Sequence, residues 1–298
     1  MFNAIFSLVF IGQILRITIP YALPALGATF SERGGIVNIG LEGIMLIGAF
    51  ATTVGTYYTN DPLFGILCGV VAGMMVAALH GIASITFKAD QIVSGIAINL
   101  FAVGITKFSC QLIFNSSSNS PRIVGFVQSS QSSIPTLINP FVVILCFLVA
   151  ILHFVLFKTR FGLRLRAVGE NPAAADSLGV RVELMRYSGL LISGVLAGLG
   201  GAWLALDQHS FTDGMSAGRG FIALAAMIIG KWNPVAAVLA CLFFGFAESL
   251  AIQLQGGLVS TQFVQIIPYV LTMLVLAGFI GRATPPASSG IPYEKGYR

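Results

Sequence analysis

Long apolar segments recur along the whole chain and are separated by short polar connections. Runs such as "GIVNIGLEGIMLIGAFATTVGTYY" and "LLISGVLAGLGGAWLAL" hold at most one charged residue each. A helix that spans a membrane needs roughly 20 mostly apolar residues. The pattern predicts about nine spans, with eight or ten as alternatives, at residues 3–27, 36–58, 62–86, 91–114, 139–157, 184–206, 218–230, 234–254 and 262–281. The span 218–230 is short, which is typical of a broken or tilted helix.

The composition agrees with an all-α, polytopic membrane helix bundle. Only 9% of the 298 residues are charged, and the mean hydropathy is +0.90. Soluble domains usually carry about 25% charged residues. The first apolar run has no basic residues before it, so we expect it to remain a membrane helix and not a cleaved signal. We expect residues 1–298 to form a single transmembrane domain.

The charged residues are distributed unevenly between the predicted connections. Basic residues in short loops stay preferentially on the cytoplasmic side of a membrane. Alternating the nine spans places twelve of the sixteen basic residues on one side: Arg33, Lys88, Lys158, Arg160, Arg164, Arg166, Arg181, Arg186, Lys231, Arg282, Lys295 and Arg298. Only Arg122 and Arg219 fall on the other side, while Arg16 and Lys107 lie within spans, where long side chains reach toward the headgroups. We therefore expect loop 158–183 and tail 282–298 to be cytoplasmic, the N-terminus to be outside, and the net charge of +5 to reflect orientation and not nucleic-acid binding.

Two sequence patterns concern how the spans pack. Spans one to four and six to nine would run in opposite directions, and "GGIVNIGLEGIMLIGAF" resembles "GRGFIALAAMIIGKW". This predicts an inverted repeat, an arrangement found in transporters with the pathway at the repeat interface. Glycines spaced four apart, at 65, 69 and 73 and again at 194 and 198, predict helix faces that approach closely.

A short polar helix is predicted inside the basic loop 158–183. Asn171 is a favourable N-cap, Pro172 suits the first helical position, and Gly179 suits the turn that ends a helix. The predicted helix runs from Pro172 to Leu178. Isolated helices of about two turns are marginal in water. Its own loop, the membrane surface or the groove of a partner protein must therefore hold it.

Three segments of the chain resemble one family of transport proteins. "SERGGIVNIGLEGIMLIGAF", "RFGLRLRAVGENPAAADSLGV" and "GRGFIALAAMIIGKWNP" are similar to segments of the membrane permease subunits of bacterial ABC importers. The resemblance is to the branched-chain amino acid/simple-sugar permease family, most closely to its nucleoside-importer subgroup, and it extends from Pro20 to Gly281. It implies a fold like that of type II ABC importers, in the bacterial cytoplasmic (inner) membrane, and import of nucleosides. Simple sugars and branched-chain amino acids are alternatives within the same fold.

The resemblance also implies a role for the capped helix and a set of partners. Its position matches the coupling helix, which docks into a cleft on the ABC ATP-binding subunit. The residues concerned are Gly169, Glu170, Asn171, Pro172, Ala173, Ala174, Ala175 and Asp176. The chain has no Gly-x-x-x-x-Gly-Lys-Ser/Thr phosphate loop, so we expect no cofactor in it and ATP hydrolysis on the partner. A second similar permease subunit, an extracytoplasmic substrate-binding lipoprotein and membrane lipid are the other expected partners.

Polar residues inside the spans are candidates for lining the path, because such groups are costly in lipid and usually face a cavity or another helix. Nucleosides are neutral and rich in hydroxyl groups and ring nitrogens, which suit amides, carboxylates and aromatic rings. The candidates are Asn38, Glu42, Asn99, Phe101, Trp203 and Glu248. For Asn38 and Glu42 the alternative is structural: capping a broken helix or holding the cytoplasmic end together.

Other functional classes are less favoured by the sequence. The four cysteines lie in apolar segments without motif spacing, and the three histidines are scattered, so neither a metal site nor a catalytic constellation is predicted. An ion-coupled secondary transporter is the remaining alternative, but it has no need for a docking helix in loop 158–183. The Ser-rich loop 115–138 is interpreted as a flexible outer connector or as a docking surface for an external partner.

Overall fold

The computed structural model describes residues 8–125, 140–254 and 284–294. Within them the chain is helical apart from turns, loops and one isolated bridge between Asn119 and Thr212. The helices are α2 (Leu8–Arg33), α3 (Leu41–Thr59), α4 (Pro62–Gly81), the π-helical turn η1 (Ile82–Thr86), α5 (Gln91–Phe114), α6 (Pro140–Lys158), α7 (Arg160–Glu170), α8 (Pro172–Ser177), α9 (Val182–Gln208), α10 (Arg219–Ile229) and α11 (Pro234–Leu254). The predicted all-α class is confirmed.

Six of the described helices are long and apolar enough to cross a membrane. They are α2, α4 with η1, α5, α6, α9 and α11, and each matches a predicted span. The predicted ninth span, 262–281, lies outside the described residues. A multi-pass membrane bundle is therefore confirmed, whereas the count of nine is not.

Two predicted boundaries were wrong by about a helical turn or more. The first span was predicted to end at 27, but α2 continues to Arg33 because its polar last turn has partners elsewhere in the fold. Trp232 Nε1 donates to the Glu32 carboxylate at 2.6 Å, and Arg33 Nε donates to the Trp232 carbonyl at 3.0 Å. The second span was predicted to begin at 36, but residues 34–40 form a turn and an irregular connection, and α3 begins at Leu41.

The α10 helix is too short to cross a membrane. Its 11 residues correspond to about 16 Å, roughly half of a hydrocarbon core about 30 Å thick. The residues after α10 lie level with the end of α2, because Arg33 bonds to the carbonyl groups of Lys231 and Trp232. The start of α10 therefore reaches about half-way along the bundle. The expectation that the segment 218–230 is not a full-length span is therefore confirmed.

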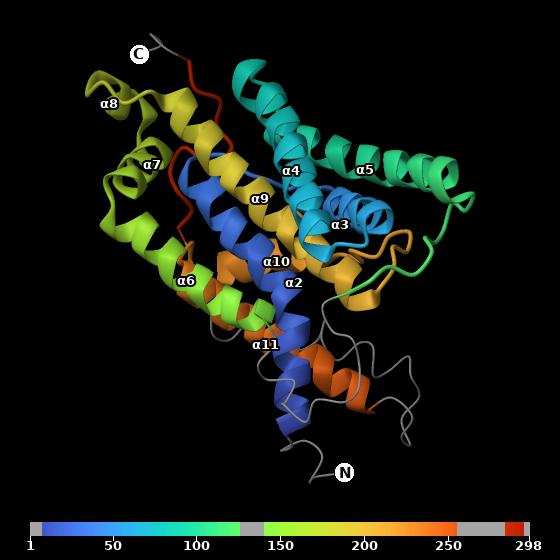
Figure 1. The fold of residues 1–298 in the computed structure, drawn as a ribbon. Helices are drawn as coiled ribbons and strands as arrows, with labels where there is room; N and C mark the ends of the chain where they lie inside the picture. The colour runs from blue at the N-terminus through green and yellow to red at the C-terminus, as the bar shows by residue number, and fades with distance from the viewer. Residues whose placement is uncertain (1–7, 126–139, 255–283, 295–298) are drawn as a thin grey trace.

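Glycines allow α9 to pack closely on α4 at the centre of the bundle. Figure 1 shows α9 passing between α2 and α4. In the most apolar stretch of α9, 78% of the residues are buried. A Cβ added at Gly198 would lie 2.6 Å from the Gly69 carbonyl oxygen, and one added at Gly73 would lie 2.6 Å from that of Gly194. Backbones thus touch directly, and the predicted small-residue faces of α4 and α9 are confirmed.

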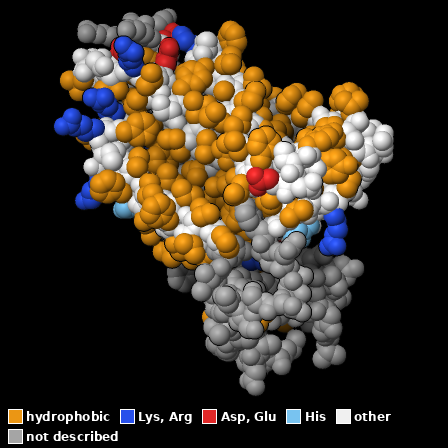
Figure 2. Space-filling view, viewed as in Figure 1, with side chains coloured by type: hydrophobic (Ala, Val, Ile, Leu, Met, Phe, Trp, Pro, Cys, Tyr) orange, Lys and Arg blue, Asp and Glu red, His pale blue; other side chains and the backbone are white. Residues whose placement is uncertain are grey.

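Most of the described basic side chains gather at one end of the molecule, which we call the basic end. Figure 1 shows α7, α8 and the tail 284–294 at the end opposite to the first turn of α2, and Figure 2 shows basic side chains beside α7 and α8. Lys88, from the α4–α5 connection, reaches the same end by pairing with Glu294 at 3.0 Å. The one-sided charge distribution in the sequence corresponds to one end of the fold.

The inverted repeat stays a prediction. The best-matched members of the two proposed halves, α3 and α10, have 19 and 11 residues. They do meet at their N-terminal ends, as the contacts of Glu42 below describe.

Candidate functional site

The short helix α8 lies at the basic end and is capped as the sequence predicts. Asn171 Oδ1 accepts a hydrogen bond from the Ala174 N–H at 3.0 Å, and Pro172 occupies the first turn. Gly179 follows the helix with φ +80°, a conformation that glycine adopts without strain. The N-cap, the first-turn proline and the terminating glycine are confirmed, although the helix ends at Ser177, one residue earlier than predicted.

The sequence analysis missed the helix that precedes α8. In α7, Thr159 caps the first turn by accepting a hydrogen bond from the Gly162 N–H at 3.2 Å. Leu165 and Val168 are buried, while Arg164 is exposed. The three-residue spacing of these buried positions, following a threonine, is the signal that was available for an amphipathic helix.

The small face of α8 is divided between the protein interior and the surface. Ala175 is 3% exposed and packs in a small cluster with Val168 and Val182. Ala173 and Ala174 are exposed, and Leu178 beyond the helix is 84% exposed. Of the three predicted coupling alanines, Ala173 and Ala174 therefore remain at the surface, whereas Ala175 does not.

Three other predicted coupling residues bond to the C-terminal tail of the same chain. Gly169 accepts a hydrogen bond from Ser288 through its carbonyl, and Glu170 Oε2 accepts one from the Ala287 N–H at 3.3 Å. Asp176 accepts one from Tyr293. The C-terminal tail is therefore a support that was not predicted, since the candidates from the sequence were the helix's own loop, the membrane surface and the groove of a partner.

The connection 34–40 between α2 and α3 is fixed by polar side chains from other helices. Asn38 is fully buried, and its Nδ2 donates to Ser193 Oγ of α9 at 3.0 Å. The Val37 N–H donates to Gln91 Oε1 at 2.7 Å, and its carbonyl lies 3.2 Å from His80 Nε2. The Asn38 side chain is enclosed by protein in this conformation.

Glu42 joins the starts of two helices. It lies in the first turn of α3, and its two carboxylate oxygens accept hydrogen bonds from the N–H groups of Gly218 and Gly220, at 2.7 Å each. Those N–H groups lie at the beginning of α10, where a helix has unpaired donors and a partial positive charge. The structural alternative for Glu42, capping a broken helix, is confirmed by this geometry.

The other predicted path residues have different surroundings. Asn99 bridges α5 and α3 by accepting from the Gly43 N–H at 2.8 Å and donating to the Ile39 carbonyl at 3.0 Å. Trp203 is 2% exposed and packs against Phe141. Phe101 lies on the open side of α5 and is 52% exposed. The structure therefore does not bring these three side chains together.

Glu248 belongs to a polar cluster that sequence reasoning only partly found. The Tyr21 hydroxyl donates to Glu248, and Arg219 Nη2 lies 3.6 Å from the same carboxylate. Tyr21 lies twelve residues before Arg33 in α2, which is about 18 Å along the helix axis. The cluster is thus deep in the bundle, and the placement of Arg219 in an outer connection was wrong. Arg219 lies at the start of the short span 218–230, where α10 begins, and this position was the available signal that it lies inside the bundle.

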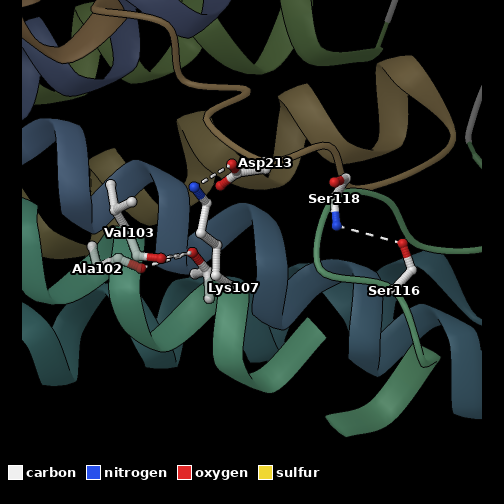
Figure 3. Close-up of polar contacts among 7 residues, drawn as sticks. Ala102, Val103, Lys107, Ser116, Ser118 and Asp213 are labelled. Atoms are coloured by element: carbon white, nitrogen blue, oxygen red, sulfur yellow. Dashed lines mark hydrogen bonds and ion pairs between the residues drawn. The ribbon is translucent and has the colours of Figure 1, made fainter. Parts of the chain in front are cut away.

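The end opposite to the basic end is joined by ion pairs and by backbone pairing. Figure 3 shows Lys107 of α5 reaching Asp213. The distance from Lys107 Nζ to Asp213 Oδ2 is 3.0 Å. Arg16 pairs with Asp207 at 2.6 Å. Within 116–125, the first part of the Ser-rich loop, the Ser120 N–H donates to the Phe211 carbonyl at 2.9 Å. This part of the loop is therefore an ordered element and not a flexible connector, and residues 126–139 lie outside the described residues.

A scan against protein-family models matches residues 10–276 to the branched-chain amino acid transport system / permease component family. The chain belongs to this family. The match covers most of the chain, so the permease is a multi-pass membrane protein whose six long apolar helices are those described above. The family resemblance seen in the sequence is confirmed.

Individual relatives of this permease are similar over nearly their whole lengths. The guanosine ABC transporter permease protein NupQ of Bacillus subtilis is 43% identical, over 97% of this chain and 99% of its own. The nucleoside ABC transporter permease protein NupC of Lactococcus lactis is 42% identical, over 96% and 97%. The guanosine ABC transporter permease protein NupP of Bacillus subtilis is 28% identical, over 94% and 84%.

Proposed function

We propose that this chain is a permease subunit of an ATP-driven importer of nucleosides in the bacterial cytoplasmic membrane. The observation that carries the proposal is the 43% and 42% identity, over almost the full length of both chains, to permeases named for guanosine and for nucleosides. The capped helix α8 at the basic end supports it, because an importer driven by another chain needs an element that docks that chain.

The complex would contain at least four kinds of component. ATP would be hydrolysed by a separate ABC subunit, so this chain would have no catalytic role and no cofactor. Bacillus subtilis has two different proteins named as guanosine ABC transporter permeases, both similar to this chain. This supports a second, related permease as the partner that completes the path. An extracytoplasmic lipoprotein would deliver the nucleoside from the other side.

In this proposal α8 receives motion from the ATP-binding subunit. Its exposed surface includes the small residues Ala173, Ala174 and Ser177, and Leu178 is exposed just beyond the helix. The end of α7 is packed tightly on the end of α2, because a Cβ at Gly169 would collide with the Arg33 carbonyl. A force on α8 would therefore be passed to the α2–α3 connection.

The path would run beside the start of α10. Helices that begin inside a membrane are typical of transporter binding sites, and here Glu42 accepts hydrogen bonds from the N–H groups of Gly218 and Gly220 at the start of α10. The Tyr21–Glu248–Arg219 cluster adds a hydroxyl, a carboxylate and a guanidinium at that level. These groups suit the hydroxyls and ring nitrogens of a neutral nucleoside. The proposed inverted repeat and the type II importer-like fold would place this site at the interface of the two halves.

The proposal is tested with the complete complex reconstituted in lipid vesicles. Uptake of a labelled purine nucleoside should be competed by excess purine or pyrimidine nucleosides. Pentoses and branched-chain amino acids at the same concentrations should leave uptake unchanged. Competition by a pentose or an amino acid, with no effect of nucleosides, would assign the chain to a different substrate class of the same family.

A further inference from the structure

The C-terminal segment 286–294, which we call the strap, lies across the basic end. It contacts the end of α7, the α2–α3 connection, the first turns of α9 and the α4–α5 connection. Figure 1 shows it as the red trace beside α7 and the start of α9. The strap therefore links four separate parts of the fold, although it has no helix or strand of its own.

The strap first caps the C-terminal end of α7. Ser288 Oγ lies 3.1 Å from the Val168 carbonyl oxygen and 2.7 Å from that of Gly169, and the Ser288 N–H donates to Gly169 at 2.9 Å. The last carbonyl groups of a helix have no partners within it and need outside donors. Ser288 is 6% exposed, so the strap replaces water in this role.

The strap also supports α8 directly. The Tyr293 ring packs against the cluster that contains Ala175 and Val182. The Tyr293 hydroxyl donates to Asp176, and burial, this bond and the negative charge of Asp176 raise the pKa of Tyr293 above its usual value. A tyrosine hydroxyl is protonated at neutral pH even with its ordinary pKa, so it can act as the donor. A helix of six residues depends on such outside contacts for its stability.

The strap also contacts the connection 34–40, which leads into α3, and the first turns of α9. The Gly290 N–H donates to the Gly35 carbonyl at 3.3 Å, and Gly35 belongs to the connection 34–40. Arg186 Nη1 donates to the Ile291 carbonyl at 3.0 Å. Arg186 is 1% exposed, and within the described part of the chain this carbonyl is the acceptor found for its guanidinium. The strap is thus fastened to the bundle by a buried charged group.

We infer that the strap is a positioning element for energy coupling, which holds α8 in a fixed orientation on connection 34–40 so that displacement of α8 reaches the start of α3. The inference rests on the proposed function, in which α8 receives motion from the ATP-binding subunit. Without the strap, α8 is attached through α7, through the Ala175 packing and through the turn at Gly179. A smaller part of a force on α8 would then reach connection 34–40.

The first test measures the stability of α8 in the full chain by hydrogen–deuterium exchange. Ser288→Ala and Tyr293→Phe each remove a side-chain hydrogen bond but keep the packing. Ser289→Ala is the matched control, because its hydroxyl makes no hydrogen bond to another described residue. Amides 173–178 should exchange about tenfold faster in the double variant S288A/Y293F, as expected for loss of one or two hydrogen bonds. Unchanged exchange in that variant would overturn the inference. This readout needs no substrate and no ATPase, so it is independent of the proposed function.

The second test measures nucleoside imported per ATP hydrolysed by the complete complex in vesicles. For S288A/Y293F we expect normal copurification of the ATP-binding subunit, retained ATP hydrolysis and a ratio lowered several-fold. The S289A complex should keep the wild-type ratio. A wild-type ratio in the double variant would overturn the inference, and so would parallel loss of assembly, hydrolysis and import. A wild-type complex that imports no nucleoside would contradict the proposed function, and the exchange measurement would still decide the role of the strap.

Discussion

Glu42 is the residue at which two interrupted segments of the bundle meet. It bonds to the N–H groups of Gly218 and Gly220 while it lies in the first turn of α3. A carboxylate at a helix N-terminus is favoured by the unpaired donors and by the helix dipole. Its removal would leave two donors without partners in a poorly hydrated region, where each unsatisfied group is costly.

Replacing Glu42 by alanine should therefore destabilise the protein and stop transport. Leaving buried donors unsatisfied costs about 1–3 kcal/mol. The measurement is thermal unfolding in detergent, accompanied by uptake in vesicles. Glu183→Ala is the matched control, because Glu183 also lies in the first turn of a helix but is exposed. Equal stability of the two variants would show that Glu42 does not hold α10 in place.

Single residues also show which contacts sequence reasoning finds. Asn171 caps α8 through a residue three positions away, and this local contact was predicted. Glu42 was predicted to cap a broken helix, but its partner Gly218 lies 176 residues away and was not identified. Arg219 was assigned to the wrong environment for the same reason, since its partner Glu248 lies on another helix. Long-range partners depend on the packing of the bundle, which one sequence does not specify.

At the scale of helices, the contact between α4 and α9 depends on the absence of side chains. Gly198→Val should separate the two helices, because the added atoms would meet the Gly69 carbonyl. Overpacking of this kind typically costs about 1–3 kcal/mol. Gly104→Val on α5 is the control, since a Cβ added there would have no atom within 4 Å. Thermal unfolding of both variants checks the prediction, which fails if G104V is as destabilising as G198V.

The exposed surface of α8 gives a second prediction at this scale. Ala174→Trp should leave the fold intact, because Ala174 is exposed, and should weaken docking of the ATP-binding subunit. Copurification of that subunit and nucleoside uptake are measured, with membrane expression as a control. Ala175→Trp should instead unfold α8, because Ala175 is buried against Val168 and Val182. Normal copurification and normal uptake with A174W would show that α8 is not the docking element.

Elements were predicted well where hydropathy alone decides them. Six of the long spans and the caps of α8 follow from apolar runs and local capping residues. The end of α2 was missed because its last turn is polar and is stabilised by Trp232, far along the sequence. α7 was missed because its short amphipathic pattern lies in a strongly basic loop.

At the scale of the whole molecule, the basic end is expected to face the cytoplasm. In a background without the four native cysteines, Ser177→Cys in α8 should resist an impermeant thiol reagent in intact cells. Ser117→Cys, exposed at the opposite end, should react. After the cells are permeabilised, both should react equally. Reaction of S177C but not of S117C in intact cells would show that the permease has the opposite orientation.

The most direct test of the account is the source of energy for nucleoside uptake. Vesicles that contain the complete complex are given either ATP on the side of the basic end or a proton or sodium gradient without ATP. The account predicts uptake with ATP alone, lost in the A174W complex, and no uptake driven by either gradient. Uptake driven by an ion gradient in the absence of ATP would contradict the account and would favour a secondary transporter.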